Sequence, residues 1–288
     1  MSFLFRLLAL LPLVVLHNLG AICGWIAWLF SSSYRKHVED NLRQAGFLAV
    51  RSECIIEQGK TMLELPRLWR ESLEENMSRI VKVNGWQHVQ AHGCSQGKKN
   101  DAKIFLSPHL GCFELSGQFL ASRLPLTSLY REPRQAWLAP LQLAGRSKSM
   151  QLAAANRSGV RQLIKALRNG ETIGILPDQV PSAGDGIWVP FFNRPAYSMT
   201  LAARLSETGA KVFTIWTQRL SYGAGFIVHV QPMSKPLSGD ITERCKQINE
   251  EMEKLIRQHP QQYLWGYNRY KCPSEAPPPL QGEPADAG

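Results

Sequence analysis

Paired cysteines are absent from this sequence. The six cysteines, at positions 23, 54, 94, 112, 245 and 272, form no C-x-x-C pair and have no regular spacing. This usage argues against a disulfide framework and is typical of reduced thiols in a cytosolic compartment. No internal repeat stands out either. His88 and His92 are four positions apart, like zinc ligands, but no third ligand accompanies them. We therefore predict no metal site and expect no cofactor.

Charged residues are absent from one long stretch near the amino terminus, from Leu7 to Phe30. A bilayer is crossed by about 20 apolar residues, so this stretch is long enough to span a membrane. A cleaved signal peptide is disfavoured because the apolar segment continues without a small-residue cleavage site. Pro12 and the His17-Asn18 pair leave a second possibility, in which two interfacial helices lie on the membrane. Membrane association of residues 1–30 is the prediction common to both.

Basic residues flank this apolar stretch: Arg6 precedes it, and Arg35, Lys36 and Arg43 follow it. The positive-inside rule then favours a cytoplasmic position for the main domain.

Lys and Arg are absent from residues 273–288, which are rich in proline and contain the acids Glu275, Glu283 and Asp286. We expect this tail to be disordered. Since the net charge is +10, residues 1–272 carry +10 + 3 = +13. Such an excess suits an anionic partner: nucleic acid, a phospholipid surface or a phosphorylated substrate. No recognised nucleic-acid-binding motif is present, so nucleic acid is not expected.

Short apolar runs alternate with helical patterns along the rest of the chain. Helical spacing is expected at residues 33–86, 113–124, 135–143, 160–167, 241–258 and within 195–208. Strands are expected at residues 103–107, 126–130, 172–176, 211–218 and 226–230. This alternation predicts an α/β fold with helices flanking a sheet. We divide the chain into an anchor at 1–30, a main domain at 31–272 and the tail at 273–288.

The segment His109-Leu-Gly-Cys-Phe-Glu114 places a histidine and a glutamate at a strand-to-helix turn. Across such a turn the carboxylate can fold back onto the imidazole, fix its tautomer and leave the other ring nitrogen free as a base. That arrangement could deprotonate an alcohol. The alternative is a structural hydrogen-bonded pair. Loops at the carboxyl ends of strands in α/β proteins are common places for chemistry, which favours the first interpretation.

Other polar residues follow the predicted strands. Arg131 lies at the end of one strand, and Asp178 lies just past another. Arg157 precedes a helix that carries Arg161, Lys165 and Arg168 on one face. These cations could be a solvated basic face or a phosphate clamp, because guanidinium groups bind phosphate bidentately.

Bulky apolar residues follow a glycine-rich turn at 184–186. Trp188, Phe191 and Phe192 would suit either the protein core or an acyl-chain groove, and the sequence does not separate the two.

The spacing from His109 to Glu114 matches the HX4E signature of glycerolipid-type acyltransferases. Around it the sequence resembles the lauroyl/myristoyl-type lipid A biosynthesis acyltransferases of the lysophospholipid acyltransferase superfamily. The likeness covers most of residues 1–271. The other blocks that carry it are Tyr130-Arg131, Gly170 with Pro177-Asp178-Gln179, Val189–Phe192 followed by Ala196 and Thr200, Thr208–Ala210 and Gln262–Lys271.

The resemblance implies a glycerolipid-acyltransferase-like mixed sheet. It also implies transfer of a fatty acyl group from acyl carrier protein to a hydroxyl of a lipid A precursor, on the cytoplasmic side of the inner membrane. His109 would be the general base, oriented by Glu114, while Arg131, Arg157 and Asp178 would contact substrate. No covalent acyl-enzyme is required.

One block departs from the family, because Tyr267-Asn-Arg269 stands where His-Arg-Arg is common. This leaves the acceptor open, and an amino-acid lipid or a lysophospholipid is the alternative. A hypothesis of another class is a membrane-tethered module that binds lipid or acyl carrier protein without turnover.

Overall fold

A computed structural model of the chain describes residues 2–92, 101–133 and 135–279. Its centre is a seven-stranded mixed sheet in the order β1-β9-β8-β2-β5-β3-β4. Neighbouring strands are parallel except for the antiparallel pair β8 and β9. The strands are β1 (Ile80–Asn84), β2 (Lys103–Leu106), β3 (Leu126–Tyr130), β4 (Gln151–Ala154), β5 (Thr172–Ile175), β8 (Lys211–Arg219) and β9 (Phe226–Pro232). The fold is thus the predicted mixed α/β type.

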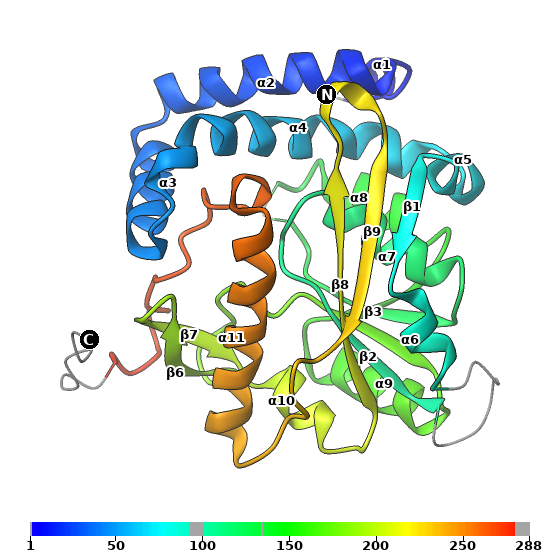
Figure 1. Cartoon of the computed structure of the whole chain (residues 1–288), viewed down its shortest axis with the longest axis vertical. Helices are drawn as coiled ribbons and strands as arrows, with labels where there is room; N and C mark the ends of the chain where they lie inside the picture. The colour runs from blue at the N-terminus through cyan, green and yellow to red at the C-terminus, as the bar shows by residue number, and fades with distance from the viewer. Residues whose placement is uncertain (1, 93–100, 134, 280–288) are drawn as a thin grey trace.

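Helices flank this sheet, and a small antiparallel hairpin lies apart from it (Figure 1). The hairpin consists of β6 (Gly186–Phe191) and β7 (Arg194–Met199). The helices before the hairpin are α1 (Ser2–Leu8), α2 (Leu13–Phe30), α3 (Ser32–Ala45), α4 (Arg51–Arg70), α5 (Leu73–Met77), α6 (Trp86–Gln90), α7 (Phe113–Ala121), α8 (Ala139–Arg146) and α9 (Arg157–Arg168). Those after it are α10 (Leu201–Ser206) and α11 (Ile241–Gln258), and short 3₁₀ turns are η1 (Leu48–Val50), η3 (Ser221–Gly223) and η4 (Pro260–Gln262).

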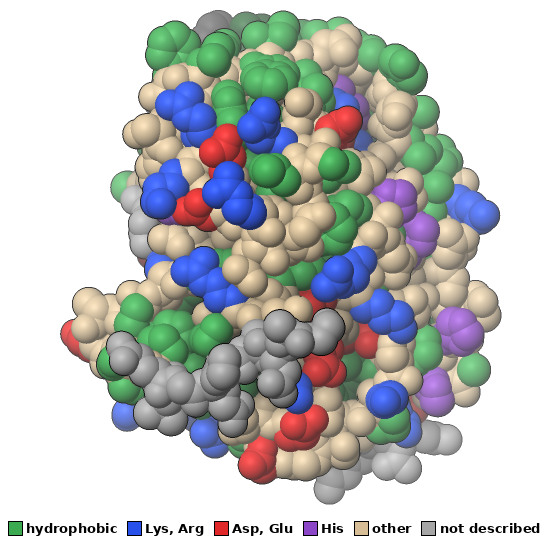
Figure 2. All heavy atoms as spheres, turned by 60° about the vertical axis from the view of Figure 1, so that its left-hand side comes forward, with side chains coloured by type: hydrophobic (Ala, Val, Ile, Leu, Met, Phe, Trp, Pro, Cys, Tyr) green, Lys and Arg blue, Asp and Glu red, His purple; other side chains and the backbone are tan. Residues whose placement is uncertain are grey.

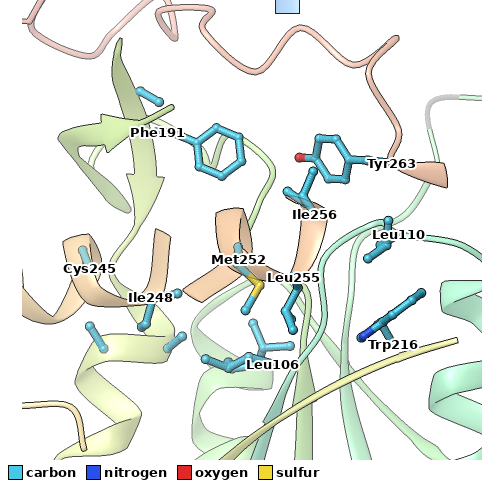
Figure 3. Close-up of a cluster of buried hydrophobic side chains, with 14 of the residues drawn as sticks. Leu106, Leu110, Phe191, Trp216, Cys245, Ile248, Met252, Leu255, Ile256 and Tyr263 are labelled. Atoms are coloured by element: carbon cyan, nitrogen blue, oxygen red, sulfur yellow. The ribbon is translucent and has the colours of Figure 1, made fainter. Parts of the chain in front are cut away.

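The central strand β2 separates two hydrophobic clusters, because successive side chains of a strand point to opposite faces. Ile104 and Leu106 belong to the cluster that contains α11, whereas Phe105 belongs to the cluster on the other face. Figure 3 shows part of the first cluster, where Leu255 of α11 and Trp216 of β8 lie near Leu110. Leu110 is the residue that follows His109, so this core anchors the predicted catalytic loop.

Helix α2 packs along α4 across one end of the molecule (Figure 1). The contact is close because glycines face each other: a Cβ on Gly24 would lie 2.2 Å from the carbonyl oxygen of Ile55, and one on Gly59 would lie 1.9 Å from that of Gly20. The inner face of α2 is buried, and the outer face is exposed. The amino-terminal segment is therefore packed onto the main domain.

The structure differs from the sequence-based expectations at several elements. Strand β1 lies within 33–86, which was expected to be entirely helical, and β4 and the β6–β7 hairpin were not predicted. In the tail, Ala276 is buried and the Trp188 indole donates to the Pro277 carbonyl at 2.7 Å, so residues 273–279 pack on the hairpin. The rest of the expected disordered tail, 280–288, lies outside the described residues.

Candidate active site

Two neighbouring parallel strands bring His109 and Asp178 together. Leu106, the last residue of β2, is in register with Ile175, the last residue of β5. His109 and Asp178 each follow this pair by three residues, at the carboxyl edge of the sheet. Residues at that edge of a parallel sheet converge even when they are far apart in sequence. The fold therefore places an imidazole beside a carboxylate from a distant part of the chain.

The Asp178 carboxylate binds His109 through both of its oxygens. His109 Nδ1 lies 2.8 Å from Asp178 Oδ1, and the His109 backbone N–H donates to Oδ2 at 2.8 Å. Burial opposes ionisation of Asp178, but the charge of His109 and these hydrogen bonds together lower the pKa of the carboxyl. An ionised Asp178 accepts a hydrogen bond from Nδ1–H, which leaves the lone pair on Nε2. The Gln179 amide nitrogen lies 3.2 Å from that Nε2.

Glu114 has a different partner from the one the sequence suggested. Arg146 at the end of α8 donates to both Glu114 oxygens, from Nε at 2.8 Å and from Nη2 at 2.6 Å. We expected Glu114 to accept a hydrogen bond from His109. In the structure Asp178 pairs with His109 instead, and Glu114 pairs with Arg146. The physical reason is that α7 turns Glu114 toward α8, while the β5 end supplies the nearer carboxylate. Burial opposes the charge on Arg146, but Glu114 keeps the pKa of the guanidinium above its usual value.

The loop from His109 to Cys112 is held by its backbone on two sides. The Gly111 N–H donates to the Gln262 carbonyl at 2.9 Å, and the Cys112 N–H donates to the Thr217 carbonyl at 2.8 Å. Gly111 has a φ of +61°, and a Cβ there would lie 2.0 Å from the Thr217 oxygen. Only glycine fits this position. Cys112 is buried, and burial raises the pKa of its thiol well above the usual value, so it packs as an apolar residue.

A cavity of about 1400 Å³ opens beside this loop. His109, Glu114 and Arg146 line it, and so do the predicted phosphate contacts Arg131 and Arg157. The structure therefore brings four of the five predicted site residues to one cavity. Asp178 lies behind the imidazole, its side chain 1% exposed, and contacts His109 where a contact to substrate was expected.

The arginines at the cavity come from separate elements. Arg131 follows β3, where it donates to the Ser182 hydroxyl at 3.0 Å, and Arg157 and Arg161 are on the first turns of α9. Among the residues that the structure describes, neither Arg157 nor Arg161 has a carboxylate within ion-pair distance. Lys165 and Arg168, on later turns of α9, do not line the cavity.

The inner part of the cavity is apolar and reaches the sheet. Its walls come from β2, β3, β8, α7 and the segment before β4; they include Phe105, Leu120, Leu126, Met150 and Ile215. The two interpretations of the aromatic residues near the hairpin can now be separated. Phe191 and Phe192 are buried in the core, and Trp188 packs beside Tyr197 away from the cavity.

Sequence reasoning missed Arg146 and Gln179 as site residues and gave Asp178 a different contact. The signal for Asp178 was available, because two buried strands with polar residues three positions past their ends are natural neighbours in a parallel sheet. For Arg146 there was no such signal. It ends a helix whose position over Glu114 depends on tertiary packing.

The sequence matches the family described as bacterial lipid A biosynthesis acyltransferase over residues 1–272. A lipid A biosynthesis acyltransferase of Haemophilus influenzae is 25% identical, with 96% of this chain and 91% of that protein aligned. The lipid A biosynthesis lauroyltransferase of Escherichia coli is 24% identical over 93% of this chain and 89% of its own. The palmitoleoyltransferase of E. coli is 27% identical over 60% and 57%. The matched residues include the amino-terminal helices, the His109 loop and the cavity. This chain is an acyltransferase and belongs to the bacterial lipid A biosynthesis acyltransferase family.

Proposed function

We propose that this enzyme transfers a fatty acyl group from an acyl carrier protein thioester to a hydroxyl of a lipid A precursor at the inner membrane. The observation that carries the proposal is the His109 imidazole, fixed by Asp178 on one nitrogen and facing a cavity with the other. The cavity joins an apolar interior to an arginine-lined part. An acyl chain fits the first, and an anionic lipid headgroup fits the second.

In the proposed reaction, His109 Nε2 takes the proton of the acceptor hydroxyl as its oxygen attacks the thioester carbonyl carbon. The tetrahedral intermediate then expels the thiolate, which receives the proton from His109. One ester C–O bond forms and one C–S bond breaks, so no acyl-enzyme is needed. Asp178 stays ionised and holds the imidazole in the reactive tautomer. When the acceptor binds, its hydroxyl would take the place of the Gln179 amide as the hydrogen-bond donor to His109 Nε2.

The oxyanion needs donors that are not already used. In the described structure the backbone N–H groups of His109, Leu110, Gly111 and Cys112 all donate to other acceptors. Donors near the loop that remain include the first turn of α7 and the Arg146 guanidinium, which Glu114 holds at the cavity wall. We assign Arg146 as the main cation for the oxyanion. Glu114 is then a positioning residue for Arg146, and its removal should weaken catalysis through that cation.

Arg131 and Arg157 are proposed to bind the phosphate of the acceptor, and Arg161 joins them because it lines the same cavity. Guanidinium groups suit this task because they keep their charge and bind phosphate oxygens in pairs. In this proposal the basic excess of the chain serves an anionic lipid.

The amino-terminal helices are proposed to lie in the plane of the membrane surface. Figure 2 shows hydrophobic side chains along the top edge, where α2 lies in Figure 1, with Lys and Arg side chains just below. Helix α2 is long and apolar enough to span a bilayer. Its inner face, however, is packed on α4, which carries many charges, so crossing would draw those charges into hydrocarbon. The outer face of the amino-terminal segment, away from α4, carries the exposed apolar residues Leu7, Leu10, Val14, Val15, Ile22, Trp25, Ile26, Leu29 and Phe30.

The η3 turn extends the same face. It packs against the start of α2, and its Tyr222 is 92% exposed. Exposed tyrosine beside apolar residues is typical of the membrane interface. Ile26→Glu should therefore lower cosedimentation with anionic phospholipid vesicles several-fold, whereas Val81→Glu, on the exposed edge strand β1, should not. Equal losses for the two variants would contradict the assigned face.

Lipid analysis tests the proposed substrate. Mass spectrometry of lipid A and total lipids from a deletion strain should show lipid A that lacks one acyl chain, restored by the wild-type gene and not by His109→Ala or Glu114→Ala. Unchanged lipid A with a missing chain on another lipid would favour a different acceptor. If both variants restored full acyl transfer, the catalytic assignment would be wrong and a binding module would be favoured.

A further inference from the structure

A buried polar cluster joins α2, α4 and β8 behind the His109 loop. At its centre is Arg219, the last residue of β8. Its Nε and Nη2 bind the Glu64 carboxylate at 2.5 and 2.7 Å, and its Nη1 binds Glu57 at 2.7 Å. Thr61 accepts from Nη2 at 2.9 Å. From the α2 side, His17 Nε2 lies 2.6 Å from Glu64 Oε1.

This cluster is costly to bury, so its presence calls for a reason. Burial alone would raise the pKa of Glu64, but Arg219 and His17 together lower it to about 2. The Arg219 side chain is fully buried. A buried ion cluster is weak evidence for added stability, since well-packed apolar residues would often serve as well. Its geometry matters more, because fixed charges and hydrogen bonds define where the attached backbone lies.

The attached backbone is the catalytic loop. Arg219 Nη2 lies 3.4 Å from the Gly111 carbonyl oxygen. The Arg219 backbone N–H donates to the Gln262 side-chain oxygen at 2.9 Å, and the Gln262 side-chain amide donates to the Arg219 backbone carbonyl at 2.8 Å. The Gln262 carbonyl in turn accepts from the Gly111 N–H. Arg219 therefore contacts Gly111 directly and through Gln262. Gly111 also packs tightly against the Thr217 carbonyl of β8, so we expect a shift at the Arg219 end of this strand to move the loop that carries His109.

We propose that Arg219 is a positioning residue for the His109 loop and that His17 makes the seating of α2 part of this positioning. The membrane-facing helix thus contributes to catalysis as well as to attachment. A displacement of catalytic groups by about 1 Å can lower a rate about 100-fold, so small changes in the cluster should be measurable. The kinetic part of this inference rests on the proposed acyl transfer, whereas its effect on loop order does not.

Three variants of α2 separate positioning from general stability. His17→Leu removes the donor to Glu64, His17→Gln keeps an amide donor, and Leu16→Ala loosens the buried face of the same helix outside the cluster. In detergent with saturating acceptor, His17→Leu should lower kcat roughly tenfold with KM for the acyl donor within about twofold. His17→Gln should restore most of kcat. Leu16→Ala should lower the melting temperature with kcat near wild type. Equal losses of kcat in Leu16→Ala and His17→Leu, or no rescue by Gln, would overturn the inference.

Hydrogen exchange of the peptide that covers residues 109–116 needs no turnover. Faster exchange in His17→Leu than in Leu16→Ala is expected, because the amides of His109, Gly111 and Cys112 are all hydrogen-bonded in the intact loop. Identical exchange would overturn the inference even if the substrate were misassigned. Should His17→Leu fail to fold, Thr61→Val removes one acceptor of Arg219 with little change in shape. It should lower kcat about two- to fivefold, and wild-type kcat and exchange in that variant would overturn the inference.

Discussion

Two histidines in this protein each bind a buried carboxylate, and they differ in what their second ring nitrogen meets. His109 binds Asp178 at 2.8 Å and is 15% exposed, with Nε2 on a cavity wall. His17 binds Glu64 at 2.6 Å and is 3% exposed, and its Nδ1 is buried without a hydrogen-bond partner in the described structure. We therefore propose that the same chemical pair provides a base in one place and a positioning contact in the other.

The comparison shows that a carboxylate beside an imidazole is insufficient to assign catalysis. A general base must reach the proton that it removes, so a histidine can be assigned as a base only if its second ring nitrogen is accessible to the substrate. In the proposed reaction Asp178 prepares His109 for an incoming hydroxyl, whereas Glu64 connects His17 to Arg219.

Removal of the His109 imidazole should have the largest effect. General acid–base catalysis contributes about 10²- to 10⁴-fold, so His109→Ala should lower kcat for acyl transfer at least about 100-fold. The melting temperature should also fall, because the buried Asp178 Oδ1 loses its partner, whereas the His109 backbone N–H still donates to Oδ2. Initial rates with a radiolabelled acyl donor measure kcat, and calorimetry measures the melting temperature. A variant that loses stability and keeps kcat near wild type would contradict the assignment of His109 as the general base.

Glu64→Gln should reduce the free energy of unfolding, and this loss should depend on pH. The pKa of Glu64 is lowered from 4.5 to about 2 in the folded protein, so its contribution is present above the unfolded pKa and is lost as pH falls through the folded one. Wild type should exceed Glu64→Gln by about 3 kcal/mol in the free energy of unfolding at neutral pH. The difference should shrink between about pH 4.5 and pH 2. Denaturant titrations across that range measure it, and a constant difference would contradict the assigned ion pairing.

Asp178→Asn should lower kcat with little change in KM for the acceptor. The amide introduced by this substitution is uncharged and has only one oxygen, so it cannot accept hydrogen bonds from Nδ1–H and from the His109 backbone N–H as the two carboxylate oxygens do. The imidazole then loses its preferred tautomer. The expected loss is about 100-fold or more, as in other histidines that depend on a carboxylate. Steady-state kinetics provide the measurement. A large rise in KM at constant kcat would instead support the substrate contact first expected for Asp178.

The sequence predicted the fold better than it predicted the partners within the site. Strands such as β2 and β5 were visible because buried parallel strands are short, largely apolar runs. Strand β1 was missed because it is short, mostly exposed and follows a helical segment. His109 was identified from a local turn. Its carboxylate partner comes from a residue 69 positions away, and spacing alone pointed to the nearer Glu114.

Arg157→Ala should have the smallest catalytic effect, expressed through substrate binding. We expect KM for an anionic acceptor to rise about tenfold with kcat nearly unchanged, as for the loss of a charged hydrogen bond. Arg168→Ala is the matched control, since Arg168 is on the same helix, exposed and outside the cavity. At several salt concentrations, KM for the anionic acceptor should rise in Arg157→Ala and stay near the wild-type value in Arg168→Ala. Equal changes in both variants would indicate a diffuse electrostatic effect.

The tautomer of the His109 imidazole tests most directly the central claim that Asp178 prepares His109 as a base. Nitrogen-15 NMR of the histidine-labelled enzyme, with the His109 signals assigned through His109→Ala, reports which ring nitrogen carries the proton. We predict that Nδ1 is protonated and Nε2 is not, both in wild type and in Glu114→Gln, and that Asp178→Asn alone shifts the tautomer population. A shift caused by Glu114→Gln and not by Asp178→Asn would contradict the assignment of Asp178 as the carboxylate that prepares the base.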